Sequence, residues 1–168
     1  MLTGVGTVKD DDPQLTVRDV DTTRQPLRVV VDSRLETPPA ARVLGVGVLI
    51  AAAMADRDKA QRLEACGAEI IVLPNAAGKV DLGALMDELG RREVNELHIE
   101  AGHKLNGSLL RERLVDELLL YLAPSILGDA ARGMFDLPAL EELDGRCTLE
   151  TREVRMIGPD VRLIARPI

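Results

Sequence analysis

The chain of 168 residues has a length typical of one domain, and a chain of this size can bury a hydrophobic core without disulfides or a metal. Its formal net charge of −7 argues against a general nucleic-acid partner, because a phosphate backbone requires a basic face. With one Tyr, one Phe and no Trp, it also lacks the aromatic platforms on which single-stranded nucleic acids stack. A phosphorylated small ligand is compatible with this composition, since one or two local cations and some backbone N–H groups suffice to bind it.

The two cysteines, Cys66 and Cys147, lie far apart and show no metal-ligand spacing, so we expect a reduced pair and no metal site. No apolar run follows a cationic leader, and none reaches the roughly 18 residues of a membrane span. These patterns predict a cytoplasmic protein without a membrane partner.

Apolar runs and segments of helical composition alternate along the chain. Residues 2–8 resemble the end of a strand followed by a Gly-rich turn, residues 10–13 a polar turn, and residues 19–26 an exposed connection. The expected strands are 27–31, 46–53, 69–73, 96–100 and 117–124. The expected helices are 57–66 closing on Gly67, 81–89 with Asp81 as its cap and Gly90 at its end, and 105–114.

Two late segments, 147–156 and 161–164, predict an antiparallel hairpin. The alternation before them predicts βαβ units. We therefore expect an α/β fold with a mostly parallel sheet, helices on both faces and a C-terminal antiparallel hairpin. No interior linker is long enough to divide the chain, which predicts a single domain over residues 1–168.

In open α/β sheets, ligands bind where strands end and helices begin. The N-terminal segment offers the Thr7 hydroxyl and the Asp11 carboxylate after flexible glycines, and Arg18 could form a charge-assisted fork with a phosphate. The same residues would also suit an ordinary turn with a surface arginine. Ser33, at the end of a strand, could bind a phosphate or a ribose hydroxyl, or it could cap a turn.

The third candidate place is IEAGHKLNGSLL, residues 99–110. A strand is expected to end at Glu100 and a helix to follow, so the backbone N–H groups of the helix start would form an anion site. Gly102 and Gly107 would let a ligand approach, and Glu100 is placed to grip a polar substrate. An ordinary βα turn has the same appearance. The chain has no Walker loop, no GxSxG and no GxGxxG after a strand, and therefore no classical dinucleotide fingerprint.

Several segments resemble one known family. LTGVGTVKDDDPQLTVR resembles the TGxGTxxxDDPxLTxR segment in the reductase domain of the bacterial riboflavin-pathway deaminase/reductase. Four further segments resemble later strands and loops of that domain in the same order: QPLRVVVDS, IEAGHKLNGSLL, LVDELLLYLAPSILG and IGPDVRLIARP. The resemblance covers nearly the whole chain. It implies a dihydrofolate-reductase-like, three-layer αβα fold.

The resemblance also implies an activity, the NADPH-dependent reduction of 5-amino-6-(5-phosphoribosylamino)uracil to the 5-phosphoribitylamino product. The hydride would reach C1′ of the ribose in its ring-opened imine form. Leu15, Arg18 and Glu100 correspond to substrate positions, with Arg18 suited to the 5′-phosphate. Glu100 is also the catalytic residue that the resemblance implies, as a proton donor or as an orienting group; a bound water could serve instead as the donor. The implied cofactor positions are Thr7, Asp11, Ser33, Gly102, His103, Lys104, Leu105, Asn106, Gly107 and Ser108.

The sequence departs from the family in two ways. The His-x-Glu and Pro-Cys-x-x-Cys motifs of a zinc deaminase are absent, so no deaminase domain and no deamination are expected. The match also begins next to Met1, so we expect the reductase domain to lack its first strand and helix, which would uncover a sheet edge. Two alternatives therefore stay open: a catalytically incompetent fragment or dimerisation module, and a similar reductase acting on another pterin or pyrimidine. The resemblance suggests a homodimer.

Overall fold

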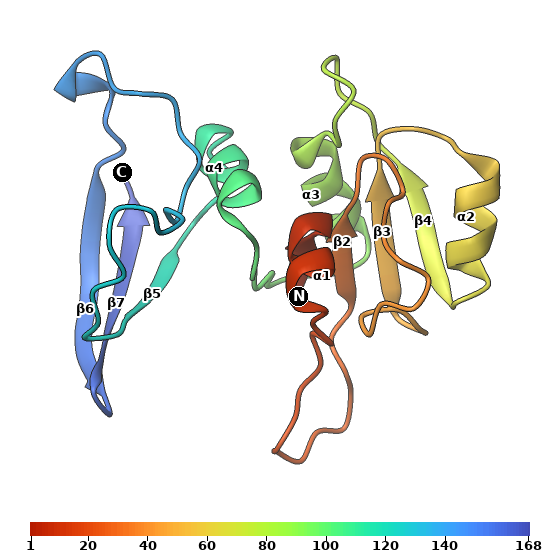
Figure 1. The fold of residues 1–168 in the computed structure, drawn as a ribbon, viewed down its shortest axis with the longest axis horizontal. Coiled ribbons are helices and arrows are strands. Elements are labelled where there is room, and N and C mark those ends of the chain that lie inside the picture. Colours follow the sequence, from red (N-terminus) through yellow and green to blue (C-terminus); the bar gives the residue numbers. More distant parts are fainter. The chain divides into compact units, whose positions relative to one another are not determined.

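The computed structural model describes residues 1–168, which form two compact units, Met1–Leu105 and Asn106–Ile168 (Figure 1). The first unit is built on a parallel sheet and the second on a separate antiparallel sheet. This arrangement confirms the α/β class, and it places the antiparallel strands in a sheet of their own. No helix is long and apolar enough to cross a membrane.

The first unit contains a four-stranded parallel sheet in the order β1-β2-β3-β4. Its elements are β1 Leu2–Gly4, α1 Val5–Asp11, β2 Arg28–Val31, β3 Val48–Ala52, α2 Arg57–Glu64, β4 Ala68–Val72 and α3 Leu82–Arg91; α4 His103–Arg111 crosses the boundary between the units. The connection over residues 19–26 is exposed, as predicted. Because the four strands are parallel, their carboxyl ends lie at one edge of the sheet, where α/β proteins bind ligands.

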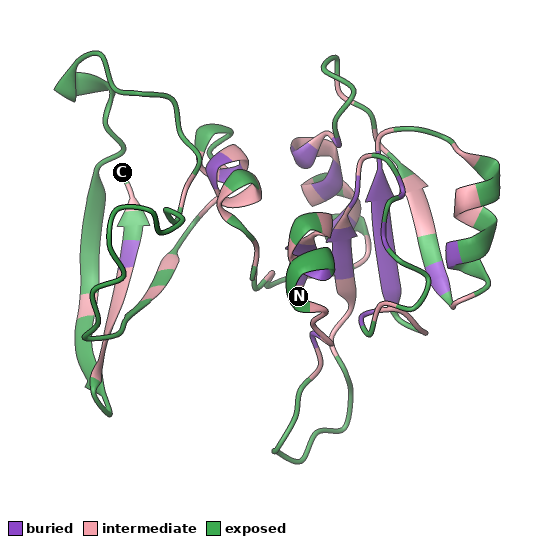
Figure 2. Ribbon diagram, viewed as in Figure 1, coloured by how far each residue is buried: buried purple, intermediate pink, exposed green.

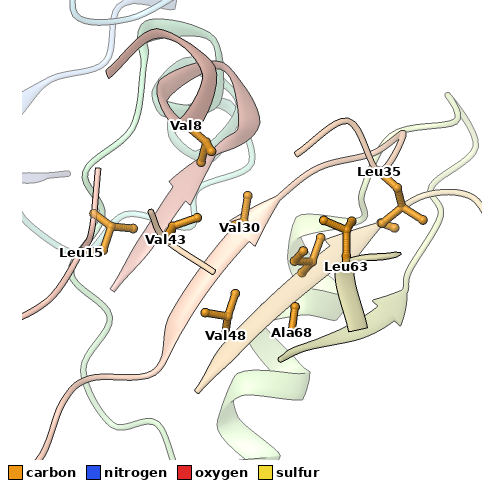
Figure 3. Close-up of a cluster of buried hydrophobic side chains, with 10 residues drawn as sticks. Val8, Leu15, Val30, Leu35, Val43, Val48, Leu63 and Ala68 are labelled. Carbon is orange, nitrogen blue, oxygen red and sulfur yellow. The ribbon is translucent and has the colours of Figure 1, made fainter. Parts of the chain in front are cut away.

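The strands β1, β2 and β3 are largely buried on both faces of the sheet. Val8 of α1 and Leu63 of α2 belong to one buried cluster with Val30 and Ile50, and Figure 3 shows Val8 and Val30 on facing sides of this cluster. Successive strand residues point to opposite faces, so the fully buried Leu49 belongs to the other face. The apolar residues of α3 that are buried, Leu82, Leu85 and Leu89, are suited to cover that second face.

The starts of α2 and α3 follow the capping rules, since an aspartate side chain caps each of them. The Asp81 side chain accepts a hydrogen bond from the Ala84 amide at 2.9 Å, which confirms the predicted cap of α3. The predicted stop at Gly90 was wrong, because α3 continues through it to Arg91. Gly67 has a φ of 87° after α2, as a helix-ending glycine should.

Two sequence predictions at the β1 edge were wrong. Residues 5–11 form helix α1 where turns were expected, because Val8 is anchored in the core and this contact outweighs the low helix propensity of Gly6. Residues 96–100 form no strand but a single parallel bridge between Leu2 and Ile99. The ladder stops there because β1 has only three residues, and the next main-chain oxygen, that of Glu100, accepts instead from the Thr3 hydroxyl.

The second unit contains β5 Leu118–Leu122, β6 Leu149–Ile157, β7 Asp160–Pro167 and the short 3-10 helix η1 Leu143–Gly145. The sheet order is β5-β7-β6, and all pairs are antiparallel. The predicted terminal hairpin is confirmed as β6 and β7. The predicted strand 117–124 is present as β5, but it pairs with β7 and not with the parallel sheet.

Candidate active site

A pocket of about 310 Å³ in the first unit gathers four residues predicted from sequence. Asp11 comes from the C-terminal end of α1, Leu15 and Arg18 from the loop that follows, and Glu100 from the segment bridged to β1. Its volume is at the lower end of the range of small-molecule sites. The pocket therefore joins the three predicted substrate positions to one predicted cofactor position.

The loop that lines this pocket has an unusual backbone. Leu15 has a φ of 51°, in the left-handed region that a bulky residue adopts rarely and at a cost of about 1–3 kcal/mol. Its side chain is buried in the core cluster, so only its main chain is available to a ligand. The main-chain amides of Leu15 and Thr16 make no hydrogen bond within the chain. Two main-chain N–H donors of this pocket-lining loop therefore have no acceptor within the chain.

Both acidic and basic residues line the pocket. Its lining includes the carboxylates of Asp11, Asp12 and Glu100 and the guanidinium groups of Arg18 and Arg42. The Asp12 side chain accepts a hydrogen bond from the Arg42 main-chain amide at 2.8 Å, which fixes the corner between α1 and the loop carrying Arg42. Sequence reasoning missed Arg42, since nothing in its local pattern distinguishes it from a surface arginine.

Glu100 is held through its main chain while its side chain stays half exposed. Thr3 is fully buried, and its hydroxyl donates to the Glu100 main-chain oxygen at 2.6 Å. The Glu100 amide donates to the Leu2 oxygen at 2.9 Å. On the exposed side, the His98 Nε2 atom lies 3.3 Å from a Glu100 carboxylate oxygen. The backbone of Glu100 is therefore fixed at two points beside the pocket that this residue lines.

Met1 also lines this pocket, and its main-chain nitrogen donates to the Leu27 oxygen at 2.6 Å.

Thr7 and Gly102, two predicted cofactor positions, lie next to each other beyond the end of β1. A Cβ added at Gly102 would lie 3.7 Å from the Thr7 hydroxyl oxygen. Gly102 and Gly6 are exposed, and a Cβ added at Gly6 would meet nothing within 4 Å. The Thr7 hydroxyl makes no hydrogen bond within the chain. Two open glycine backbones beside a free hydroxyl provide the close approach that a dinucleotide diphosphate requires.

Ser33 lies elsewhere, at the end of β2, and does not line the pocket. Its side-chain oxygen accepts from the Val80 amide at 3.2 Å. The preceding Asp32 is almost fully buried and accepts from both the amide and the hydroxyl of Thr37 at 2.7 Å. Asp32 therefore holds the loop after β2, and it leaves Ser33 at the carboxyl edge of the sheet.

The remaining predicted cofactor positions occupy the first half of α4. His103, Lys104 and Leu105 belong to the first unit, and Asn106, Gly107 and Ser108 to the second. Gly107 is buried against the chain itself, because a Cβ there would overlap the main chain of Asp136. The Arg111 guanidinium donates to the Asp136 oxygen at 2.6 Å and to the Ser108 hydroxyl oxygen at 2.9 Å. Because Gly107 has no side chain, the main chain of Asp136 packs against it, whereas the sequence suggested that a ligand would lie there.

Comparison with known proteins identifies relatives over the whole chain. The family described as RibD C-terminal domain matches residues 1–163. The riboflavin biosynthesis protein RibD of Escherichia coli K12 is 38% identical over 97% of this chain and 47% of its own length. The 2,5-diamino-6-ribosylamino-4(3H)-pyrimidinone 5′-phosphate reductase of Methanothermobacter thermautotrophicus is 33% identical over 96% of this chain and 76% of its own length.

A solved structure, RibD of Acinetobacter baumannii, superimposes with a TM-score of 0.86 at 29% identity and covers 99% of this chain and 46% of its own chain. The chain therefore spans about half the length of the RibD proteins it matches.

Proposed function

This chain belongs to the RibD C-terminal domain family, and we propose that it reduces 5-amino-6-(5-phosphoribosylamino)uracil to the 5-phosphoribitylamino product with NADPH. The observation that carries the proposal is the pocket that gathers Asp11, Leu15, Arg18 and Glu100. The name of the archaeal relative supports it, since that protein is a reductase of a ribosylamino-pyrimidinone 5′-phosphate. An aminopyrimidine linked to a phosphorylated sugar needs a cation at one end and hydrogen-bond acceptors at the other.

The pocket residues would divide the substrate between them. The Arg18 guanidinium would bind the 5′-phosphate, because its planar fork matches two phosphate oxygens. The Leu15 amide is a further donor on the same loop. The Glu100 carboxylate would accept hydrogen bonds from the sugar hydroxyls or the amino groups, and it would thereby orient C1′. Glu100 is also the residue from which a proton could reach the reacting nitrogen.

The cofactor would bind beside this pocket. Bound NADPH supplies the hydride that reduces C1′. The Thr7 hydroxyl and the open backbone at Gly102 would hold its diphosphate, and Asp11 would contact it at the edge of the substrate pocket. Ser33 would bind it farther along the carboxyl edge of the sheet. The other proposed positions in the first unit are His103, Lys104 and Leu105 at the start of α4. Asn106, Gly107 and Ser108 belong to the second unit, where Gly107 packs against the main chain of Asp136 and leaves no room for a ligand.

The direct test is turnover by the purified chain, followed by the loss of NADPH absorbance with the phosphorylated uracil substrate. We expect R18Q to raise the KM for this substrate about 10- to 100-fold, the value of a charge-assisted hydrogen bond to phosphate, with the Kd for NADPH unchanged. E100Q should lower kcat/KM about 100-fold or more. R62Q is a matched control, since exposed Arg62 lies on α2, which packs against β4 at the other end of the sheet.

The outcomes separate the alternatives. Binding of NADPH without turnover would favour an incompetent fragment. Preference for the 2,5-diamino-pyrimidinone substrate, or turnover of an unphosphorylated pterin, would assign the chain to a different reductase of similar fold.

We further propose that the chain forms a homodimer through the antiparallel sheet. Strand β6 is exposed over most of its length (Figure 2). Val154 and Met156 of this strand lie on the same sheet face as Leu122, and the exposed fractions of the three residues are 64%, 60% and 47%. A row of exposed apolar residues on one sheet face is typical of an interface. M156E should shift the mass measured by light scattering from dimer to monomer, and an unchanged mass would exclude this face.

A further inference from the structure

We propose that Arg42 is a second phosphate ligand of the pocket and that it acts with Arg18 on a phosphomonoester. The inference rests on the proposed function and extends it, because neither the sequence motifs nor the role of Arg18 requires another cation. Arg18 and Arg42 both line this pocket, and neither guanidinium group forms an ion pair or hydrogen bond within the chain. In a chain whose net charge is −7, two unpaired arginines in one pocket call for an anionic partner.

The charge balance of the pocket supports a second cation. Three side-chain carboxylates line it, those of Asp11, Asp12 and Glu100. If Arg18 alone faced a phosphate of about −2 charge, the surrounding side chains would carry net negative charge and repel it. Arg42 reduces this imbalance, and two guanidinium forks can together bind all the terminal oxygens of a phosphomonoester.

The main chain adds donors at the same place. Leu15 and Thr16 are among the residues that line the pocket, and their main-chain amides have no acceptor within the chain. The positive φ of Leu15 gives this loop a left-handed residue, a conformation found in backbone nests that bind anions. A phosphate could accept hydrogen bonds from these two amides and from both arginines.

Arg42 is held in place by its own backbone, which makes it suitable for substitution. Its amide donates to the Asp12 carboxylate at 2.8 Å, and this bond survives any change of the side chain. The side chain is exposed, so its removal leaves no cavity. We therefore expect R42Q to fold with an unchanged Tm.

The experiment compares R42Q with the charge-matched control R62Q. Calorimetry with ribose 5-phosphate and with ribose isolates the phosphate contribution, and it does not depend on turnover. We expect R42Q to weaken ribose 5-phosphate binding and to raise the KM of the phosphorylated substrate by about tenfold or more, while R62Q matches the wild type. The dephosphorylated substrate should respond less than about twofold to either change.

A loss that R42Q shows equally with phosphorylated and dephosphorylated ligands would overturn the proposal, and so would no loss with either. If R42Q lowers the Tm, R42K becomes the deciding variant, because lysine keeps the positive charge but lacks the planar guanidinium group. R42K should lose part of the affinity for the phosphorylated ligand alone, and wild-type affinity in R42K would count against a bidentate contact. If the wild-type chain neither binds nor reduces the phosphorylated substrate, the proposed function itself fails, and that result is separate from any difference between R42Q and R62Q.

Discussion

The hydroxyl of Thr3 is the single side-chain group that links the core of the first unit to the main chain of Glu100. Thr3 has an exposed fraction of 0%, and its hydroxyl lies 2.6 Å from the Glu100 main-chain oxygen. T3V replaces this hydroxyl with a methyl group of nearly the same shape. The substitution therefore creates no cavity, and it removes the hydrogen bond alone.

The expected cost follows from the fate of the acceptor. A hydrogen bond contributes about 0.5–1.5 kcal/mol net, and the cost rises to about 1–3 kcal/mol when a buried partner is left unsatisfied. The Glu100 oxygen would lose its donor inside the sheet edge, so we expect T3V to destabilise the chain by about 2 kcal/mol. For a chain of this size, that free energy corresponds to a decrease in Tm of about 4–8 °C.

T3S is the matched control, since it keeps the hydroxyl and removes one methyl group. It should cost about 1 kcal/mol through lost burial, and it should leave the substrate KM unchanged. T3V should raise that KM, because the Glu100 backbone is no longer fixed beside the pocket. In a double-mutant cycle, E100Q should have a smaller effect on KM in the T3V background than in the wild type.

Two results would refute this reasoning about Thr3. One is a T3V variant that unfolds at the wild-type temperature. The other is full additivity of T3V and E100Q in KM, which would show that Thr3 does not act through Glu100.

G107A should destabilise the second unit by about 1–3 kcal/mol, because the new Cβ would overlap the main chain of Asp136. Faster proteolysis of residues 123–148 would report this destabilisation. G90A is the control and should be neutral or stabilising, because a Cβ at Gly90 would meet nothing within 4 Å. R92Q should lower the Tm near neutral pH, since the Arg92 hydrogen bond lowers the pKa of Glu69. A lowered glutamate pKa stabilises the folded state above its ordinary value of 4.5, and the effect disappears as pH falls through the lowered value. The Tm difference between wild type and R92Q should therefore shrink below about pH 4, and a constant difference would contradict the assignment.

The buried strands of the parallel sheet were predictable because their sequences carry their own signal. β2, β3 and β4 each come from a short Val- or Ile-rich run between turn residues, and the cap at Asp81 follows from local hydrogen bonding. Helix α1 was not predictable, since it depends on the burial of Val8 against strands that follow later in the chain. The loss of strand 96–100 likewise depends on the length of a partner strand.

The candidate site shows the same division. Asp11, Leu15 and Arg18 come from one segment, so a sequence motif could indicate all three. Their convergence with Glu100 depends on a bridge between residues 97 positions apart, Leu2 and Ile99. Arg42 and Thr3 carried no local signal, because their roles arise from contacts across the fold.

Two locally unfavourable features meet at this pocket. Asp10, Asp11 and Asp12 follow one another at the C-terminal end of α1, where the helix dipole favours cations, at a cost of about 0.3–1 kcal/mol for each exposed carboxylate. Leu15 adds the cost of a left-handed backbone. Fold stability alone would favour a lysine at the helix end and a glycine in the loop. Because residues that break local rules concentrate at functional sites, these costs support the proposal that the loop from Asp11 to Arg18 binds a ligand.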